Sequence, residues 1–259
     1  MKRILILLFI LSSILNCLSC GAQEYDVFLL IGQSNMAGRG WMTEEDEQVF
    51  DENVFVLNAK GKPVPAVNPL NQHSSIRKDY SMQQICPGFG FSRKLSRNTG
   101  RKILLVVNAR GGTTIRQWMK GAEDGFYDEA VRRTRQAMKH GNLKAVLWHQ
   151  GCGDARTADT YMDSLAVFVA DLRADLGLQV PFIAGELGRW RHHVEEFNLM
   201  IRSISEHIPD SDYISSEGCM PIVTARSGGK PDMRDPHFDR ASQIIIGERY
   251  ADKVMQMCY

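Results

Sequence analysis

A serine directly follows an apolar stretch near the start of the chain. Residues 26–31 are almost entirely apolar, and the polar turn Gly32-Gln33-Ser34-Asn35 comes next. An apolar run bounded by turn residues is typical of a strand covered on both faces, and ligands of parallel sheets bind at the carboxyl ends of such strands. Ser34 is therefore a candidate nucleophile. The alternative is that Ser34 or Asn35 only caps the next helix, since the chain has no Gly-x-Ser-x-Gly motif here.

Two further apolar runs are also followed by groups suited to catalysis. Gly111-Gly112 come shortly after residues 103–108, and paired glycines let backbone N–H groups approach an oxyanion or a phosphate closely. A tight turn is the alternative. Gln150 follows residues 145–148 and could donate its amide N–H to a developing oxyanion.

A histidine beside carboxylates precedes the last helical pattern, in Asp235-Pro236-His237-Phe238-Asp239. A carboxylate that bonds an imidazole fixes its tautomer and stabilises the imidazolium formed when a serine proton is taken. His237 is therefore a candidate general base. The alternative is a surface pair without a catalytic role.

Composition excludes several classes of function. The chain has 259 residues, of which 44% are hydrophobic and 24% charged, with a formal charge of +1. This provides a core but no attraction to polyanions, so nucleic acid is not an expected partner. No Cys-x-x-Cys or His-x-x-x-His cluster appears, so we expect no metal. Oligomeric state has no signature in the sequence.

The first 22 residues are typical of a signal peptide. Lys2 and Arg3 precede an apolar run, residues 4–15, that is too short to span a bilayer comfortably, and small residues follow it. Cys20 before Gly21 also resembles the lipid-attachment cysteine of bacterial lipoproteins, so a lipid anchor to a membrane stays open. We expect an exported protein, periplasmic or at the cell surface, with one domain over residues 23–259.

Short apolar runs alternate with helical patterns along the rest of the chain. Alternation of this kind implies right-handed crossovers and a parallel sheet between helices. Residues 41–80 form an insertion with only one convincing strand. We expect this insertion to pass over the edge of the sheet at which the site lies. The expected strands are residues 26–31, 54–58, 103–108, 145–148 and 181–185, and the expected helices are 89–97, 127–140, 161–176, 194–207 and 242–257.

Six motifs, taken in order, resemble the SGNH (GDSL-like) hydrolase superfamily, and within it carbohydrate esterase family 6 and the sialate O-acetylesterases. They are GQSNMAGRG (residues 32–40), NPLN (68–71), GGT (111–113), WHQG (148–151), DYISSEG (212–218) and HFD (237–239). The resemblance implies a three-layer α/β/α flavodoxin-like domain that needs no cofactor. It also implies removal of acetyl groups from sugar hydroxyls, of the acetylxylan or sialic acid type, through an acetyl-serine.

The resemblance also assigns residues to roles. Ser34 would be the nucleophile and His237 the base. The oxyanion hole would consist of the N–H of Ser34, the N–H of Gly112, with Gly111 as the less favoured choice, and the amide of Gln150. Substrate binding is expected from the residues that flank the nucleophile, which are Gln33, Asn35 and Arg39.

Two departures from the family concern the carboxylate that orients the base. Cys152 stands where relatives usually have glutamate, and Arg234 stands where many have aspartate. Asp235 is the expected substitute, with Asp232 and Asp154 as reserves. If none of them reaches His237, the protein would be a weakened, carbohydrate-binding pseudo-esterase. A non-catalytic surface protein is a third possibility.

Some cysteines and aromatic residues are left over by these assignments. Cys86, Cys152, Cys219 and Cys258 allow three pairings, and the departures from the family raise the hypothesis of a bond between Cys152 and Cys219. Five residues in or near loops that follow strands could contact a sugar. For Trp118 and Trp190 the alternative is packing at the rim of the core. The five residues are Arg39, Trp41, Trp118, Arg189 and Trp190.

Overall fold

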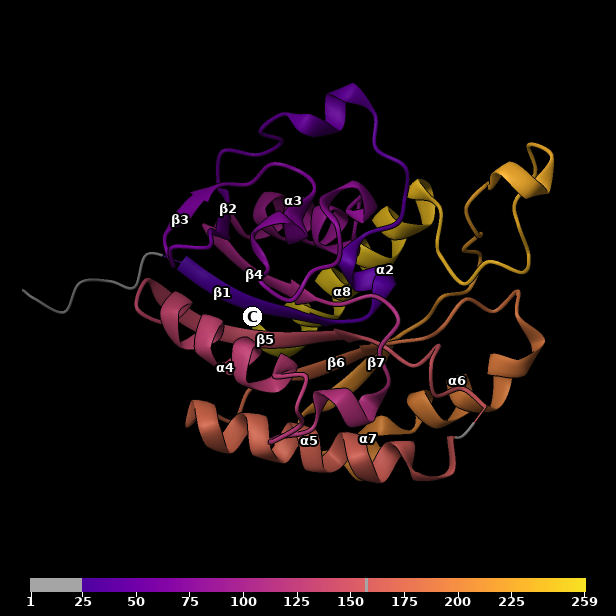
Figure 1. Cartoon of the computed structure of the whole chain (residues 1–259). Coiled ribbons are helices and arrows are strands. Elements are labelled where there is room, and N and C mark those ends of the chain that lie inside the picture. The colour runs from indigo at the N-terminus through magenta and orange to yellow at the C-terminus, as the bar shows by residue number, and fades with distance from the viewer. Residues whose placement is uncertain (1–24, 157) are drawn as a thin grey trace, which may run out of the picture.

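A seven-stranded sheet crosses the middle of the molecule, with helices on both of its faces (Figure 1). The computed structural model describes residues 25–156 and 158–259, so the expected signal peptide lies outside the described residues. The strand order is β3-β2-β4-β1-β5-β6-β7. The strands are β1 (Tyr25–Gly32), β2 (Val54–Leu57), β3 (Pro63–Pro65), β4 (Ile103–Ala109), β5 (Gly141–His149), β6 (Phe182–Gly185) and β7 (Ser211–Ile214).

All strand pairs are parallel except β2 with β3, which form an antiparallel edge. Without that edge pair, the order β4-β1-β5-β6-β7 is the flavodoxin-like 2-1-3-4-5 arrangement. The strand order reverses beside β1, and in open parallel sheets the ligand binds at such a switch point. The carboxyl end of β1 is therefore the place where the fold favours a site.

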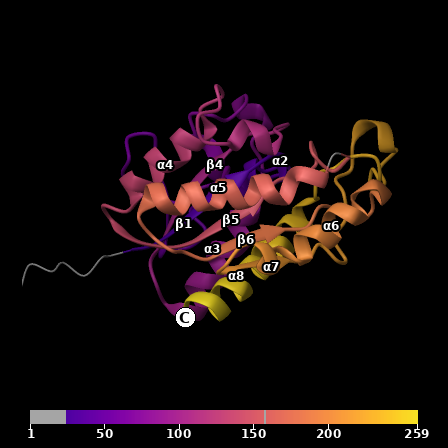
Figure 2. The same ribbon diagram turned by 90° about the horizontal axis from the view of Figure 1, so that it is seen from below.

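The helices form two layers. Helices α3 and α8 cover one face, and α4 and α5 lie side by side across the other, as Figure 2 shows from below. The α-helices are α2 (Ser34–Ala37), α3 (Pro87–Thr99), α4 (Phe126–Ala137), α5 (Tyr161–Leu176), α6 (Glu195–Arg202), α7 (Ile204–His207) and α8 (Arg240–Cys258). None of the helices in the described ranges is long and apolar enough to cross a membrane.

Strand β1 supplies both layers of the core because successive side chains of a strand point to opposite faces. Val27, Leu29 and Ile31 pack against the layer that contains α4 and α5. Phe28 and Leu30 pack against the layer that contains α3 and α8. All five side chains are completely buried, so β1 is held on both sides and fixes the position of the residues that follow it.

The three-layer fold and its main elements agree with the sequence prediction, but two strands were missed. Strand β3 contains Pro63 and Pro65, and proline is typical of edges rather than strand interiors. Strand β7 begins with Ser211 and Asp212, which give no apolar run. The insertion contains both β2 and β3, so it holds one strand more than expected.

Candidate active site

The turn after β1 places Ser34 at the carboxyl edge of the sheet. Gly32 has a φ of +135°, and a Cβ at this position would lie 2.4 Å from the carbonyl oxygen of His149 on β5. Only glycine allows this close approach. Gln33 is the residue that precedes helix α2 and Ser34 is its first residue, so the alternative in which Ser34 or Asn35 caps the helix is wrong.

Three side chains form a continuous chain of hydrogen bonds at this edge. Ser34 Oγ lies 3.0 Å from His237 Nε2. On the other side of the ring, His237 Nδ1 lies 2.7 Å from Asp235 Oδ1. The same Asp235 oxygen accepts the backbone N–H of His237 at 3.0 Å. Nδ1 therefore carries the proton, and Nε2 is free to accept one from Ser34.

The surroundings of His237 favour its neutral form. Burial lowers the pKa of His237 below its ordinary value, Arg39 and Arg191 act in the same direction, and Asp235 opposes them. A base must be unprotonated in order to accept a proton. The imidazole is therefore in its competent form over the neutral pH range.

The reserve carboxylates do not contact the imidazole, because each has other partners. Asp232 bonds Thr224 and Arg226, and these contacts hold its pKa well below the usual range. Asp154 accepts the N–H of Ile115 at 3.2 Å. Asp235 is therefore the carboxylate that lies beside His237.

Asn35 fixes the loop that carries His237. Its Nδ2 donates to the carbonyl of Pro236 at 3.1 Å, and its Oδ1 accepts the N–H of Phe238 at 3.1 Å. The side chain is completely buried. The buried amide is therefore engaged on both sides of His237 and positions this loop, and the contact of Asn35 with substrate stays a prediction.

Gln33 has a comparable holding role on the other side of the nucleophile. Its Oε1 accepts the N–H groups of Gly151 and Cys152, both at 3.1 Å, and only 3% of the residue is exposed. This bond ties the nucleophile turn to the loop after β5. The structure thus gives Gln33 a role in shaping the site, and its contact with substrate stays a prediction.

Arg39 is the expected substrate-binding residue that lies at the site and is accessible. One of its nitrogens donates to the carbonyl of Met82 at 2.6 Å. Its charge interacts with Asp235 and lowers the pKa of His237. A second nitrogen would lie 2.8 Å from a Cβ at Gly111. The guanidinium therefore lies between the turn at Gly111 and the triad, which is formed by Ser34, His237 and Asp235.

The two glycines after β4 differ in what they allow. A Cβ at Gly111 would lie 3.3 Å from the Cβ of Ser34, so the absence of a side chain lets this backbone approach the nucleophile. Gly112 has a φ of +76°, in the left-handed region that favours glycine. Gly111 and Gly112 therefore form a turn whose backbone lies against Ser34.

Gln150 lies below this turn rather than facing the serine. Its Nε2 donates to the carbonyl of Thr113 at 2.9 Å and to Asp154 at 2.6 Å, and its Oε1 accepts the hydroxyl of Tyr161 at 2.8 Å. The residue is completely buried. Both amide hydrogens are used within the protein, so the geometry gives Gln150 a supporting role under the glycine turn instead of the expected oxyanion contact.

The cysteines near the site are free thiols. Cys152 and Cys219 do not form the bond raised as a hypothesis, and all four cysteines in the described ranges are unpaired. Burial raises the pKa of Cys152 to about 11, so it is protonated at neutral pH and unsuited to act as a nucleophile. Cys219 instead accepts a contact from Arg249 at 3.8 Å.

The three tryptophans that were candidates for sugar contacts differ in how far they are exposed. Trp118 is completely buried and packs edge-on against Trp148. Trp190 is half-buried, and its indole N–H donates to the carbonyl of Asp235 at 2.9 Å. Trp41 is 56% exposed. Of the three tryptophans, only Trp41 presents its ring to solvent.

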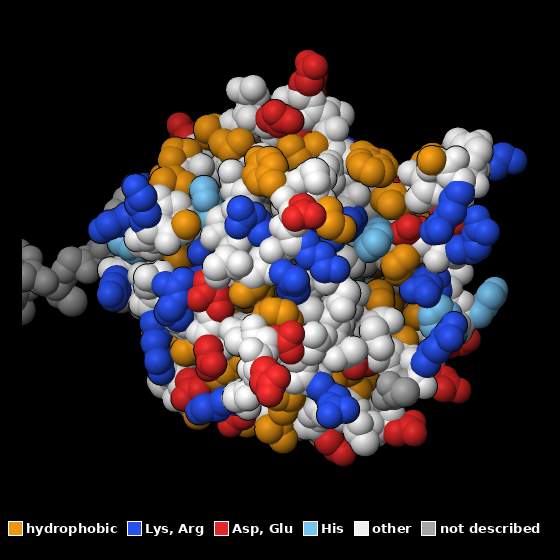
Figure 3. Space-filling model, in the orientation of Figure 1, with side chains coloured by type: hydrophobic (Ala, Val, Ile, Leu, Met, Phe, Trp, Pro, Cys, Tyr) orange, Lys and Arg blue, Asp and Glu red, His pale blue; other side chains and the backbone are white. Residues whose placement is uncertain are grey.

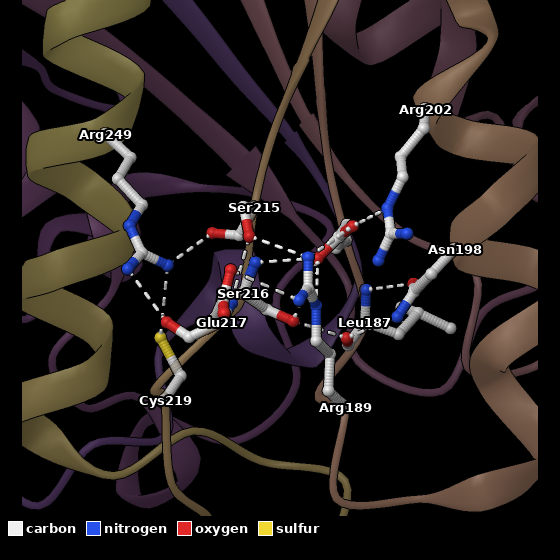
Figure 4. A network of polar contacts seen from close by, with 10 residues as sticks. Leu187, Arg189, Asn198, Arg202, Ser215, Ser216, Glu217, Cys219 and Arg249 are labelled. Atoms are coloured by element: carbon white, nitrogen blue, oxygen red, sulfur yellow. Dashed lines mark hydrogen bonds and ion pairs between the residues drawn. The ribbon is translucent and has the colours of Figure 1, made fainter.

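A buried carboxylate that the sequence analysis missed holds the loops after β6 and β7 together. Glu186 is completely buried and forms ion pairs with Arg189 and Arg202, which converge from opposite sides in Figure 4. It also accepts the N–H of Ser216 at 2.9 Å. Glu186 directly follows an apolar strand, and this position could have marked it as a candidate site residue. An acidic residue after a strand is, however, equally typical of a solvated loop.

The fold and the residues at its edge define an SGNH-type hydrolase architecture. In residues 25–156 and 158–259, no group of three or more histidine, cysteine or acidic residues could hold a metal ion. The chain belongs to the family described as carbohydrate esterase, sialic acid-specific acetylesterase, whose model matches residues 24–256.

Known proteins agree with this assignment. A probable carbohydrate esterase of Arabidopsis thaliana is 31% identical over 178 residues, which are 61% of this chain and 66% of the relative. A solved structure of an Arabidopsis thaliana protein has a TM-score of 0.72 at 23% identity and covers 91% of this chain and 100% of its own. The structure of NanS has a TM-score of 0.65 at 19% identity, covering 91% and 98% respectively. These structural likenesses show the fold.

Proposed function

We propose that the protein is an exported carbohydrate O-acetylesterase that hydrolyses acetyl esters on sugar hydroxyls, of the acetylxylan or sialic acid type, through an acetyl-Ser34 intermediate. The observation that carries the proposal is the chain from Ser34 Oγ to His237 Nε2 at 3.0 Å and from His237 Nδ1 to Asp235 Oδ1 at 2.7 Å. Family membership supports the acetyl ester as the reacting group.

The first half of the reaction forms the acetyl-enzyme. Ser34 Oγ attacks the acetyl carbonyl carbon while His237 Nε2 takes the hydroxyl proton, and Asp235 stabilises the resulting imidazolium. The tetrahedral intermediate then collapses, the bond to the sugar oxygen breaks, and the imidazolium returns the proton to that oxygen. The deacetylated sugar leaves.

The second half releases acetate. Water attacks the acetyl-serine and gives a proton to His237, and collapse of the new tetrahedral intermediate restores the Ser34 hydroxyl. In both halves the negative oxygen is stabilised by backbone N–H groups, those of Ser34 and of Gly112 or Gly111. A single donor of this kind contributes about 10²- to 10³-fold to the rate.

The second candidate is the pseudo-esterase, which keeps the sugar site without activity. Cys152 in place of glutamate is the observation that favours it. The short contact between Asp235 and His237 favours the active enzyme instead, because it supplies the orientation that the glutamate would have given. Sugar binding without acetate release, with release restored by Cys152→Glu, is the result that would select the pseudo-esterase.

Acetate release from a panel of acetylated glycans tests the proposal. The wild type should release acetate, and Ser34→Ala should lose nearly all activity. Ser164→Ala is the matched control, because Ser164 lies on α5 and bonds only the carbonyl of Thr160. Full activity of Ser34→Ala would overturn the assignment of the nucleophile.

Export is a separate part of the proposal and rests on the N-terminal sequence alone. The mass of the mature N-terminus, measured on protein from cells, should show cleavage before residue 23. A lipid-modified Cys20 would instead establish the anchor, and an intact N-terminus would overturn export.

A further inference from the structure

A cavity of about 570 Å³ lies beside the segment that joins the nucleophile turn to the insertion. Its wall includes Trp41 and Tyr80, which are each 56% exposed although both are large aromatic residues. The proposed hydrolysis at Ser34 does not use either ring. Exposed aromatic rings at a concave surface are typical of ligand sites, where they supply contact area at low entropic cost.

The two rings stand on backbone that is held in place. The indole N–H of Trp41 donates to the carbonyl of Val223 at 3.2 Å, across 182 positions of sequence. The backbone around Tyr80 forms a short 3₁₀ helix, in which the N–H of Gln83 bonds the carbonyl of Tyr80 at 2.8 Å. The Trp41 ring is thus held by its own side-chain bond, and the main chain that carries Tyr80 is fixed.

The rest of the lining is mainly neutral and polar. Gln72, Gln83 and Gln84 each bond nearby backbone, and Asn68 donates to the carbonyl of Asp46 at 3.2 Å. Asn68 is 97% buried, and its Oδ1 has no hydrogen-bond partner within the described residues. The lining thus offers amide groups to a ligand, several of them held in place by bonds to backbone.

The charge of the lining distinguishes this cavity from its surroundings. Lys and Arg side chains are spread over the face shown in Figure 3, from its left side across the centre to its right side. Of the residues that line this cavity, by contrast, only Glu47 carries a charge, and that charge is negative. The lining therefore combines flat aromatic rings with amide groups and has no cationic group. This combination fits a neutral sugar ring and does not fit an acidic one.

The cavity and the triad share one segment of chain. Gly40, next to Trp41, pairs with Ile85. Arg39, on the other side of Gly40, bonds the carbonyl of Met82. The charge of Arg39 also acts on Asp235. The partner of Trp41, Val223, belongs to the loop that leads to His237. The cavity wall and Arg39 therefore lie near each other, on the segment that joins the turn of Ser34 to the insertion.

We propose that this cavity is a second sugar subsite, which binds a neutral sugar unit of the same glycan chain whose acetyl group is at Ser34. The inference rests on the proposed function and extends it. The preferred substrate is an acetylated oligosaccharide or polysaccharide with neutral rings, and not an acetylated monosaccharide. Trp41 and Tyr80 stack on the sugar ring.

The test compares kcat/KM for an acetylated xylo-oligosaccharide with that for an acetylated methyl xyloside. The wild type should prefer the oligosaccharide, and Trp41→Ala and Tyr80→Ala should each reduce that preference about tenfold, mainly through KM, as expected for loss of about 1.4 kcal/mol of binding. Trp41 bonds Val223 in the loop that leads to His237, whereas the Tyr80 side chain has no hydrogen bond to that loop within the described residues. Tyr80→Ala therefore tests the cavity without removing a bond to the loop of His237. The matched control is Val167→Ala, an exposed apolar residue on α5.

A binding measurement separates this inference from the proposed function. Xylohexaose without acetyl groups should quench tryptophan fluorescence of the wild type and of Ser34→Ala alike, but not of Trp41→Ala. Absence of acetate release with intact xylohexaose binding would overturn the esterase and keep the subsite. Equal kcat/KM for the two substrates in the wild type, or tighter binding of an oligogalacturonate than of xylohexaose, would overturn the subsite.

Discussion

Asp235 Oδ1 lies 2.7 Å from His237 Nδ1, although only Pro236 separates the two residues in the chain. The same oxygen also accepts the backbone N–H of His237 at 3.0 Å. The loop therefore folds back on itself, so that one carboxylate holds both the backbone and the ring of the base. In the mechanism that we propose, this contact supplies the acidic member of the triad, in a chain that carries Cys152 at the position where relatives usually have glutamate.

The pH dependence of kcat/KM should report His237. Because the folded pKa is lowered from 6.5, activity should be present above that pKa, should fall as the pH falls through it, and should reach half its maximum below pH 6.5. The measurement is a pH profile with an aryl acetate. A midpoint above pH 6.5 would contradict the assignment.

Asp235→Asn should change both the size and the position of this profile. Asp235 raises the pKa of His237, so its removal should move the acidic limb to lower pH. Activity should fall by up to about 10⁴-fold, the loss known for the corresponding change in the serine protease triad. Asp163→Asn, on the exposed side of α5, is the control. An unchanged limb with full activity would show that Asp235 does not act on the base.

Asn35→Ala should lower kcat about 10- to 100-fold without changing the nucleophile, because it releases the loop on both sides of His237. Loss of these buried bonds should also cost about 1–3 kcal/mol of the free energy of unfolding. Asn35→Asp keeps the acceptor for Phe238 but sets a buried carboxylate against the Pro236 carbonyl, so it should be at least as damaging as Asn35→Ala. Kinetics and urea unfolding measure the two effects, and an unchanged kcat in a less stable protein would exclude the positioning role.

Gly111→Ala should inactivate the enzyme more than it destabilises the fold. The new Cβ would lie 2.8 Å from an Arg39 nitrogen and 3.3 Å from the Cβ of Ser34, so the turn or the guanidinium must shift. Gly100→Ala is a useful comparison, because no atom lies within 4 Å of its added Cβ. It should reduce the free energy of unfolding through its positive φ and leave kcat unchanged. Equal kcat in both variants would contradict the close approach at Gly111.

Gln150→Ala separates the two roles considered for this amide. If Gln150 supports the glycine turn, Gln150→Ala should reduce the free energy of unfolding by about 1–3 kcal/mol, because the buried bonds that its amide donates to Asp154 and to the Thr113 carbonyl are lost. An oxyanion donor would instead show a loss in kcat of about 10²- to 10³-fold in a protein of normal stability. Chemical unfolding and kinetics on the same preparation distinguish the two.

The sequence predicted those residues whose role depends on their position along the chain. It was less informative about residues whose role depends on the direction in which the side chain points. Ser34 follows from a polar turn at the end of an apolar run, and His237 with Asp235 follows from a histidine beside carboxylates before the last helical pattern. Gln33 and Asn35 flank the same serine, but both point into the protein. No periodicity distinguishes a side chain that faces the solvent from one that bonds a neighbouring loop.

Long-range partners account for the rest of what was missed. Gln150 follows a strand as a catalytic residue would, yet Tyr161 and Asp154 take up its amide. Glu186 pairs with Arg202, which lies on a later helix, and its burial depends on that pairing. Strands β3 and β7 lie at the two edges of the sheet, where proline and polar residues are tolerated and the apolar pattern fades.

The central claim is that Ser34 is the nucleophile, and covalent labelling tests it most directly. A fluorophosphonate should modify the wild type once, and peptide mass spectrometry should place the label on Ser34. The rate of labelling should fall in Asp235→Asn, and Ser34→Ala should not be labelled. A label on another residue, or equal labelling of Ser34→Ala, would contradict the account.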